Sequence, residues 1–259
     1  MLEQQRKTEI MSRLRKEGFV SVADLMKQLQ ASRSSVMRDL IDLEESGLLE
    51  RTRGGAALKS RTAVLTFGTE LPTQEKRDLH AKQKQKIAAK TAALIPDHST
   101  VYLDSGTTTV YLLPHLSDKD VTVITPSMYL LRHLPAEFNG TIYLLGGMYN
   151  RKYDMNFGSV TSREAGEYRY DTAVISASAI QMETGEVMGA DPDVTAIKQI
   201  AMARAGRKIL AADSSKYSAS AVITFAQLSD FDELVTELEE AEGEENEYED
   251  CRPKKESAD

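Results

Sequence analysis

Hydrophobic residues recur with helical spacing through the first part of the chain. They predict one helix over residues 3–17, a second beginning after the cap residue Ser21, and a third beginning after the cap residue Ser32. Residues 48–58 then form two short apolar runs around a glycine pair, which is typical of a β-hairpin. Helices joined by short turns and followed by a hairpin predict a winged helix-turn-helix domain over residues 1–58.

Further along the chain the pattern changes to short apolar runs, such as residues 101–103 and 172–176, separated by amphipathic stretches. Strands of this kind, alternating with helices, predict a parallel sheet covered on both faces. The expected fold class is therefore α/β, with the winged domain placed before an α/β sensor domain. A polar linker is expected over residues 59–80, the sensor over residues 81–237, and an acidic, disordered tail over residues 238–259.

Charge is distributed unevenly along the 259 residues. The net charge is −8, yet residues 1–61 hold 12 Lys+Arg against 9 Asp+Glu, whereas residues 228–259 hold 3 against 14. A basic head fits nucleic-acid binding, which the total charge alone argues against. The single cysteine, Cys251, allows no disulfide within one chain, and no apolar run reaches the roughly 20 residues that span a bilayer. A charged N-terminus without a secretory signal completes the expectation of a cytoplasmic protein with no membrane contact.

The third helix and the hairpin carry the candidate DNA contacts. The first turns of the helix would enter a major groove, where arginine reads guanine and serine contacts base edges or phosphates. The hairpin would bring arginines and a flexible backbone close to phosphates or the minor groove. The predicted DNA-binding residues are Ser32, Arg33, Ser34, Ser35, Arg38, Arg51, Arg53, Gly54 and Gly55. The alternative is a structural helix cluster with an ordinary charged face.

A second candidate site follows the strand at residues 101–103. A glycine and three hydroxyls at the start of a helix offer free N–H groups and the positive end of the helix dipole to an anion. The loop lacks the lysine of a nucleotide-binding P-loop, so a small phosphorylated ligand is expected instead. The predicted residues are Asp104, Ser105, Gly106, Thr107, Thr108 and Thr109. The alternative is a hydroxyl-rich helix cap that binds no ligand.

Other loops at predicted strand ends supply further candidates, because ligands of open α/β sheets bind at the carboxyl ends of the strands. Gly147 follows one strand, Asp191 leads into the helix that carries Lys198, and Asp213 and Lys216 follow another strand. Lysines would hold a phosphate and carboxylates would accept sugar hydroxyls. The alternatives are a solvated helix face for Lys198 and a surface turn for Asp213 and Lys216.

The N-terminal motifs resemble those of DeoR-type regulators. They are SRSSVMRDL from Ser32, LEESGLLER from Leu43 and RGGA from Arg53. Two positions depart from the family pattern: Met37 replaces the first arginine of an Arg-Arg pair, and Arg53 replaces the wing histidine. The architecture is unaffected, but Met37 removes one expected DNA contact.

The later motifs resemble the effector domain of the same family. They are DSGTTT from Asp104, TPS from Thr125, a glycine pair, and DSSKYS from Asp213. The family usually has Thr-Asn-Ser at the second motif, so Ser127 is matched while Pro126 removes an amide and a backbone donor. The resemblance covers residues 6–237. It implies a sensor fold similar to ribose-5-phosphate isomerase, a phosphorylated sugar effector, and an oligomeric repressor of carbohydrate genes.

The sequence therefore predicts a DNA-binding transcriptional regulator, a repressor of carbohydrate-metabolism genes controlled by a phosphorylated sugar. Its expected partners are a double-stranded DNA operator, that sugar, and at least one further copy of itself, because paired half-sites need a dimer. No catalytic residue and no cofactor is expected, and the four histidines, His80, His98, His115 and His133, lack metal-binding spacing.

Two alternatives remain open at this stage. The first is a sugar-phosphate isomerase-like enzyme or hydrolase with an appended helical domain, in which Asp104, Asp191 and Asp213 act as acid or base. The second is a regulator whose sensor has lost ligand binding and serves only for oligomerisation, for which Pro126 is the motivating feature.

Overall fold

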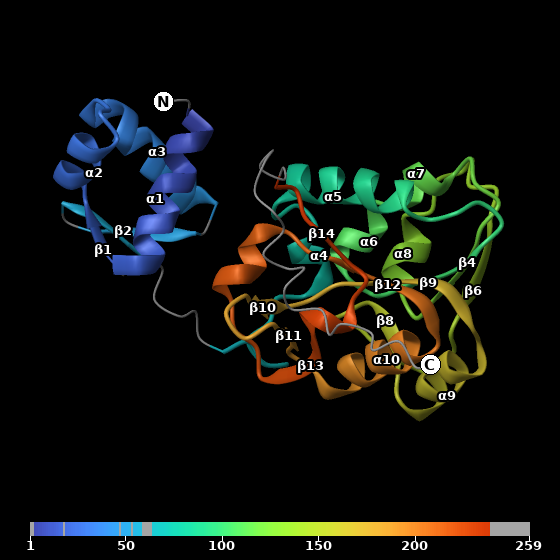
Figure 1. Ribbon diagram of the computed structural model, residues 1–259. Helices are drawn as coiled ribbons and strands as arrows, with labels where there is room; N and C mark the ends of the chain where they lie inside the picture. The colour runs from blue at the N-terminus through green and yellow to red at the C-terminus, as the bar shows by residue number, and fades with distance from the viewer. Residues whose placement is uncertain (1–2, 18, 47, 53, 59–63, 239–259) are drawn as a thin grey trace, which may run out of the picture.

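The computed structural model describes residues 3–17, 19–46, 48–52, 54–58 and 64–238 (Figure 1). Arg53, one of the predicted DNA contacts, lies outside these residues, as do residues 59–63 of the predicted linker and residues 239–259 of the predicted tail. The elements of the N-terminal part are α1 (Glu3–Glu17), β1 (Phe19–Ser21), α2 (Val22–Gln28), α3 (Arg33–Glu45), β2 (Leu49–Thr52) and β3 (Gly55–Leu58).

The elements of the larger body begin at residue 73. Its helices are α4 (Thr73–Lys76), α5 (Ala81–Ala93), α6 (Thr107–Val110), α7 (Leu113–Leu116), α8 (Met128–Arg132), α9 (Ser159–Glu167), α10 (Pro192–Ala203), and the 3-10 turns η1 (Ser214–Ser218) and η2 (Leu228–Asp230). Its strands are β4 (Thr100–Leu103), β5 (Thr122–Thr125), β6 (Thr141–Leu144), β7 (Met148–Asn150), β8 (Met155–Phe157), β9 (Tyr170–Ile175), β10 (Ala179–Gln181), β11 (Glu186–Gly189), β12 (Ala205–Ala211), β13 (Ile223–Gln227) and β14 (Glu233–Val235).

The N-terminal part is a winged helix-turn-helix, which confirms the expected architecture. Both predicted caps form: the Ser21 hydroxyl accepts a hydrogen bond from the Asp24 amide at 3.0 Å, and the Ser32 hydroxyl accepts one from the Ser35 amide at 3.2 Å. Capping satisfies amides that have no partner inside the helix, and so fixes where each helix begins. The apolar faces of α1, α2 and α3 pack into one core with buried residues such as Ile10, Leu14, Leu25, Val36 and Leu40.

The wing contains a strand that the sequence pattern did not reveal. β1 pairs with β3, so that the predicted hairpin becomes a sheet in the order β1-β3-β2. Gly55 makes this close pairing possible, because a Cβ atom there would lie 2.2 Å from the Val20 carbonyl oxygen. β1 was missed because a run of three residues carries too little alternation to be distinguished from a turn.

A parallel sheet in the order β14-β12-β9-β4-β5-β6 forms the centre of the body. Successive side chains of a strand point to opposite faces. Val101 and Leu103 accordingly join the core beneath α5, α7 and α8, whereas Tyr102 joins the core beneath α9 and α10. Figure 1 shows these two sets of helices on opposite sides of the sheet. The expected α/β class, with helices on both faces, is confirmed.

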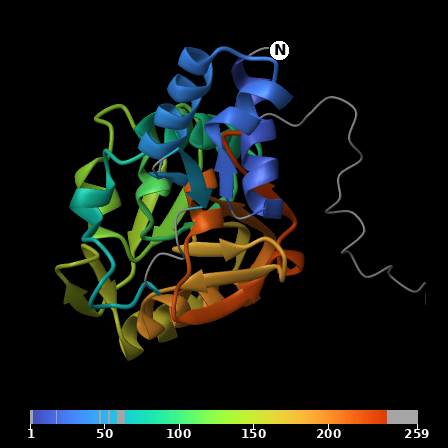
Figure 2. The same ribbon diagram turned by 90° about the vertical axis from the view of Figure 1, so that its left-hand side faces the viewer.

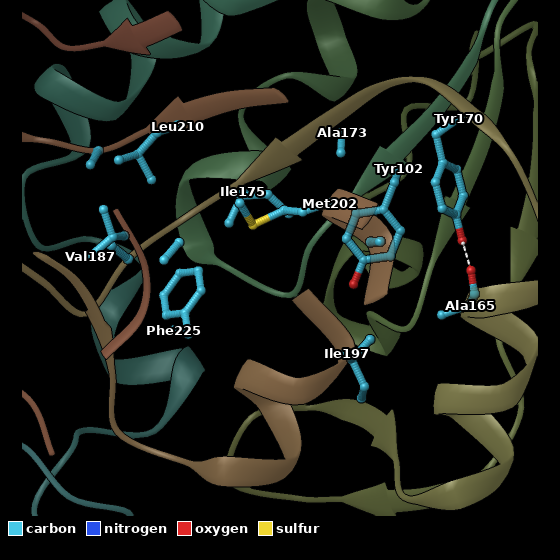
Figure 3. Close-up of a cluster of buried hydrophobic side chains, with 14 of the residues drawn as sticks. Tyr102, Ala165, Tyr170, Ala173, Ile175, Val187, Ile197, Met202, Leu210 and Phe225 are labelled. Carbon is cyan, nitrogen blue, oxygen red and sulfur yellow. Dashed lines mark hydrogen bonds between the residues drawn. The ribbon is translucent and has the colours of Figure 1, made fainter. Parts of the chain in front are cut away.

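Two tyrosines anchor one end of the core beneath α9 and α10 (Figure 3). The rings of Tyr102 and Tyr170 lie 5.3 Å apart between their centroids, and the Tyr170 hydroxyl donates a hydrogen bond to the Ala165 carbonyl at 2.7 Å. Since Ala165 belongs to α9, this bond ties that helix to β9. It also satisfies a phenol that burial would otherwise leave without a partner.

Several elements of the body were not anticipated. An antiparallel sheet in the order β10-β11-β13 appears as the gold to orange arrows in the lower part of Figure 2. The hairpin of β7 and β8 and the helix α9 are further additions. Residues 107–116 form two short helices, α6 and α7, with Pro114 inside the first turn of α7. These strands are short, and β13 pairs with a distant segment, so local patterning carries little trace of them.

Residues 64–80 contact the body along their length. The Leu65 amide donates to the Ser220 carbonyl at 2.8 Å, and the Val222 amide donates to the Leu65 carbonyl at 3.0 Å. Further on, the Thr73 amide donates to the Lys152 carbonyl at 2.9 Å. Much of the segment read as a linker is therefore attached to the sensor side of the chain.

Candidate functional site

The order of the parallel strands creates a reversal point beside β4. From β4 the chain continues to β5 and β6 on one side, and later returns to β9, β12 and β14 on the other side. The loops that leave β4 and β9 at their carboxyl ends therefore diverge, and ligands of open α/β sheets bind in the crevice between such loops. Asp104 directly follows the first of these strands and Ser176 directly follows the second.

Asp104 is the centre of a buried polar network at this point. Its carboxylate accepts hydrogen bonds from the Gly106 amide at 2.7 Å, from the Ser176 amide at 2.7 Å, and from the Ser176 hydroxyl at 2.8 Å. The Lys198 ammonium lies 2.9 Å from the same carboxylate and donates to the Ser176 carbonyl at 2.6 Å. The network joins the loops after β4 and β9 to the helix α10.

Burial would raise the pKa of Asp104, but the charge of Lys198 and the hydrogen bonds from Ser176 and Gly106 hold it below its usual value. Asp104 is therefore a stable anion. Lys198 is 7% exposed, so it does not lie on a solvated helix face. A buried ion pair with this many hydrogen bonds is costly to break from either side.

A pocket opens directly above this network. Some of the predicted effector residues line it: Ser105 and Gly106 from the β4–α6 loop, Asp191 at the N-cap of α10, and Lys198 within α10. Its remaining wall comes from residues that the sequence reading did not single out: Glu70, Thr73, Lys76, Tyr153, Ser176, Ser178, Gly189, Ala190, Val194 and Thr195. Asp191 itself is held in place as the N-cap of α10, where it accepts from the Asp193 and Val194 amides at 2.9 and 3.1 Å.

Lysines gather around the pocket. Burial lowers the pKa of Lys76, Glu70 opposes that change, and the nearby charges of Lys216 and Lys198 lower it further. Lys84 is 3% exposed, and burial together with the charge of Lys216 lowers its pKa to about 8. Burial is the largest cause of both shifts, and repulsion between the lysines adds to it, so an anionic ligand close to these ammonium groups would favour their charged forms. Lys76 and Lys84 had no sequence signal beyond their basic character.

In the loop of residues 104–109, several hydrogen-bonding groups are already used by bonds within the loop itself. The Thr109 hydroxyl lies 2.9 Å from the Asp104 carbonyl and 2.6 Å from the Gly106 carbonyl. The Gly106 amide already donates to the Asp104 carboxylate. Thr107 and Thr108 are buried at the start of α6, and they are not among the residues that line the pocket.

The other predicted effector residues lie outside the pocket lining. Asp213 is buried and caps η1, and one of its carboxylate oxygens has no hydrogen-bond partner among the described residues. Burial would raise the pKa of Asp213, but Lys216 and other donors lower it.

Ser127 is buried and caps α8, while Gly147 packs against Thr161. Their roles in ligand binding stay predictions.

Pro126, the residue that departs from the family motif, is also remote from the pocket lining. It is buried, and its carbonyl accepts from the Asn156 amide at 2.8 Å. The proline therefore lies between β5 and β8 and forms no part of the pocket wall.

The DNA-facing candidates lie at the exposed end of α3. Arg33, Ser34 and Arg38 are exposed, whereas Ser35 is partly buried and Ser32 caps the helix. In the wing, Gly54 is exposed with a φ of +93°, and Gly55 is buried. The Arg51 guanidinium lies 2.6 Å from the Glu44 carboxylate, so that a DNA phosphate would have to compete with Glu44.

The position of α3 is fixed from its inner side. Arg6 of α1 holds the buried carboxylate of Asp39 through two contacts at 2.7 and 3.1 Å. Met37, which stands where the family has an arginine, packs against the domain core instead of facing outward. This placement gives a physical reason why a hydrophobic residue is tolerated there.

Two further features of the described residues bear on function. They contain no group of three or more His, Cys, Asp or Glu side chains arranged to hold a metal ion. No helix in this part of the chain is long and apolar enough to cross a membrane.

Comparison with known protein families identifies both halves of the chain. Residues 6–62 match the DeoR-like helix-turn-helix domain, and residues 79–238 match the DeoR C-terminal sensor domain. The chain belongs to the DeoR family of transcriptional regulators. The resemblance expected from the motifs is thereby confirmed, and the DeoR-type reader implies DNA as a partner.

Transcriptional regulators are similar to this chain over most of its length. The transcriptional regulator FruR of Bacillus subtilis is 30% identical over 93% of both chains. The transcriptional repressor GlcR of the same organism is 31% identical over 92% of this chain and 89% of its own. DeoR-type regulators therefore match this chain from the reader through the sensor.

Two solved structures are similar to parts of this chain at low sequence identity. The eIF2B-beta2-delta2 complex from C. thermophilum matches with a TM-score of 0.50 and 13% identity, over 90% of this chain and 67% of that chain. Ribose 5-phosphate isomerase A from Methanocaldococcus jannaschii matches with a TM-score of 0.39 and 17% identity, over 52% of this chain and 54% of that chain.

Proposed function

We propose that this DeoR-family regulator represses carbohydrate-metabolism genes and that a phosphorylated sugar, bound in the pocket at the reversal point of the sheet, controls its affinity for DNA. One observation carries the proposal. Lys198 and Lys76 line a pocket whose floor is a hydrogen-bonded carboxylate and serine network, on the same chain as an exposed reader helix. Cations suit a phosphate, and the polar floor suits hydroxyls.

The two ends of the ligand are assigned to different groups. Lys76 and Lys198, with Lys84 and Lys216 nearby, supply the positive charge that attracts a phosphate. Asp191, Ser176 and Ser178 supply hydrogen-bonding groups for sugar hydroxyls. Ser105 and Gly106 are assigned to the phosphate end, because they line the pocket together with Lys76 and Lys198.

On the DNA side, we assign Arg33 and Ser34 to base edges and Arg38 to base or phosphate. The wing adds Arg51 and its glycine turn. Paired half-sites require two copies of the reader, so that the active species is at least a dimer. A regulator of this kind works in the compartment that holds the chromosome, which supports the cytoplasmic location expected from the sequence.

The names of relatives support the choice of carbohydrate genes. A lactose phosphotransferase system repressor from Staphylococcus aureus is 28% identical over 93% of this chain and 95% of its own. Relatives of similar length therefore include a repressor whose name refers to a sugar.

The proposal also holds that the pocket binds its ligand without transforming it. An isomerase needs a carboxylate that readily takes up a proton. Asp104 is a poor candidate, because Lys198, Ser176 and Gly106 occupy it and keep its pKa low. Incubation with pentose and hexose phosphates, followed by product analysis, is expected to show no isomerisation or phosphate release.

A thermal-shift screen tests the central claim. Ligand that binds only the folded chain raises the melting temperature by mass action. We expect phosphorylated sugars to include compounds that raise it, whereas the matching unphosphorylated sugars leave it unchanged. The Lys198→Met variant should lose the shift, while Lys82→Met, an exposed lysine of α5, should keep it. No shift with any phosphorylated sugar would contradict the proposal.

A further inference from the structure

The segment that leads from the wing to the pocket is held against the body at its first end. Leu65 forms a parallel β-bridge with Ala221 through backbone bonds of 2.8 and 3.0 Å to the residues on either side of it. Phe67 then packs edge-on to Tyr153 at 5.9 Å between ring centroids. The ammonium of Lys152 lies 4.7 Å from the centre of the Phe67 ring and donates to the Phe67 carbonyl.

The second end of this segment is held equally firmly. Thr73 is 2% exposed, its amide donates to the Lys152 carbonyl at 2.9 Å, and its hydroxyl donates to the Tyr153 carbonyl at 3.0 Å. Thr73 also lines the pocket. We call residues 64–76 the strap.

Glu70 lies between these two attachments and points into the pocket wall. It is 9% exposed, and its carboxylate accepts from the Ser178 hydroxyl at 2.9 Å and from the Lys76 ammonium at 3.1 Å. Ser178 belongs to the loop after β9, and all three residues line the pocket. The strap is thus closed onto the site by groups that a sugar phosphate would itself seek.

We propose that Glu70 is an effector-contacting residue and that the strap carries the ligand signal to the reader. This inference rests on the proposed function. A phosphate near Lys76 competes with the Glu70 carboxylate for the ammonium, and sugar hydroxyls compete with Ser178 for the carboxylate. Ligand binding therefore replaces contacts between the strap and the body with contacts between the strap and the ligand. A ligand shifts the balance between two conformations only if it interacts differently with each, and this replacement provides that difference.

The strap is well placed for this role by its position in the chain. Residues 59–63 alone separate it from β3 of the wing, so a change in how the strap is held acts on the connection to the reader. Contacts made within the sensor core, such as the Asp104–Lys198 pair, have no comparable link to the wing.

Glu70→Gln tests the proposal on the full-length chain without any ligand. It keeps the side-chain size but removes the charge attraction for Lys76. The control is Glu75→Gln, an exposed residue of the same segment that lines no part of the pocket. We expect hydrogen exchange of the amides in residues 64–76 to become at least about threefold faster in Glu70→Gln and to stay unchanged in Glu75→Gln.

DNA affinity provides the second readout. The operator is a duplex selected from a random library by the wild-type protein, and binding is measured by fluorescence anisotropy. We expect Glu70→Gln to change the dissociation constant by at least about threefold, with Glu75→Gln matching the wild type. Ser178→Ala removes the same contact from the body side, so it keeps the test informative if Glu70→Gln folds poorly.

The outcomes separate the two claims. If Glu70→Gln and Ser178→Ala leave both strap exchange and DNA affinity at wild-type values, the strap is not a signalling element and the inference is overturned. If these variants change both strap exchange and DNA affinity while no phosphorylated sugar binds the wild type, the strap is a signalling element but its ligand is not a phosphorylated sugar.

Discussion

At the scale of single residues, the Asp104 carboxylate is the group on which the sensor depends most. Asp104→Asn removes the charge that neutralises buried Lys198 and weakens the hydrogen bonds from Ser176 and Gly106. We expect a loss of about 3–5 kcal/mol in the free energy of unfolding, measured by urea titration, because a buried charge is left uncompensated. Asp118→Asn, at an exposed aspartate, should change it by less than about 0.5 kcal/mol.

A double-mutant cycle identifies the cause of that loss. Once Lys198→Met has removed the ammonium, the additional cost of Asp104→Asn should fall markedly, because the two residues form one unit. Additive effects of the two substitutions would show that the ion pair is not the source of the instability.

Lys84 predicts a pH dependence of stability with a definite sign. Its pKa is about 8 in the folded chain against the usual 10.5, so the unfolded chain binds more protons between these values. The contribution of Lys84 to the free energy of unfolding therefore rises as the pH increases from about 8 to 10.5. Relative to Lys84→Met, the wild type should gain up to about 3 kcal/mol in the free energy of unfolding between pH 7 and pH 10.

The control for this effect lies on the same helix. Lys82 is exposed, so Lys82→Met should follow the wild type across the pH range. If the difference between wild type and Lys84→Met is flat with pH, then Lys84 titrates normally and the crowding of positive charge around the pocket has been overstated.

Some of the residues predicted from sequence to bind the effector line the pocket, although their role in binding stays a prediction. Ser105, Gly106, Asp191 and Lys198 were proposed from sequence, and the structure places all four in one pocket wall. Glu70 was not proposed, because it lies in a polar stretch without periodicity and acquires its partners only through folding.

At the scale of elements, α3 is both a core helix and the exposed reader. Its inner face packs Val36 and Leu40 into the domain core, whereas Arg33 and Arg38 face outward. Helical spacing dictates this division, since residues three and four apart share a face. The predicted start of this helix after Ser32 is confirmed.

Arg38→Ala tests the outward face of this helix. If Arg38 contacts a phosphate, the substitution should weaken binding to all duplexes alike and lower the slope of log K against log salt by about 1. If it contacts a base, the loss of about 1–3 kcal/mol should be confined to the selected operator. Arg163→Ala, an exposed arginine of α9, should leave DNA binding unchanged.

β13 is one of the elements that sequence patterning missed, because its partner strand is distant in the chain. β13 pairs with β11, which lies more than thirty residues earlier, and each strand of that sheet has at most five residues. Short strands have few alternating positions, and the partner that stabilises them is invisible to a local window.

At the scale of the whole molecule, the pocket exists because the strand order reverses beside β4. The loops after β4 and β9, the start of α10, the hairpin region at Tyr153 and the strap meet there. None of these segments forms a binding site alone. Their convergence also places a ligand site next to the part of the chain that continues into the wing.

The sequence by itself determined the α/β class, the winged reader, the family, and the residues at the ends of β4 and β12 that carry its motifs. These features depend on local spacing, capping and short-range patterns, which the chain states directly. Tertiary structure alone decided that Lys198 is buried against Asp104, that Lys76 and Glu70 join the pocket, and that Met37 packs inward. The physical reason is that burial and electrostatic neighbours depend on which distant segments the fold brings together, and sheet order is not encoded in any single segment.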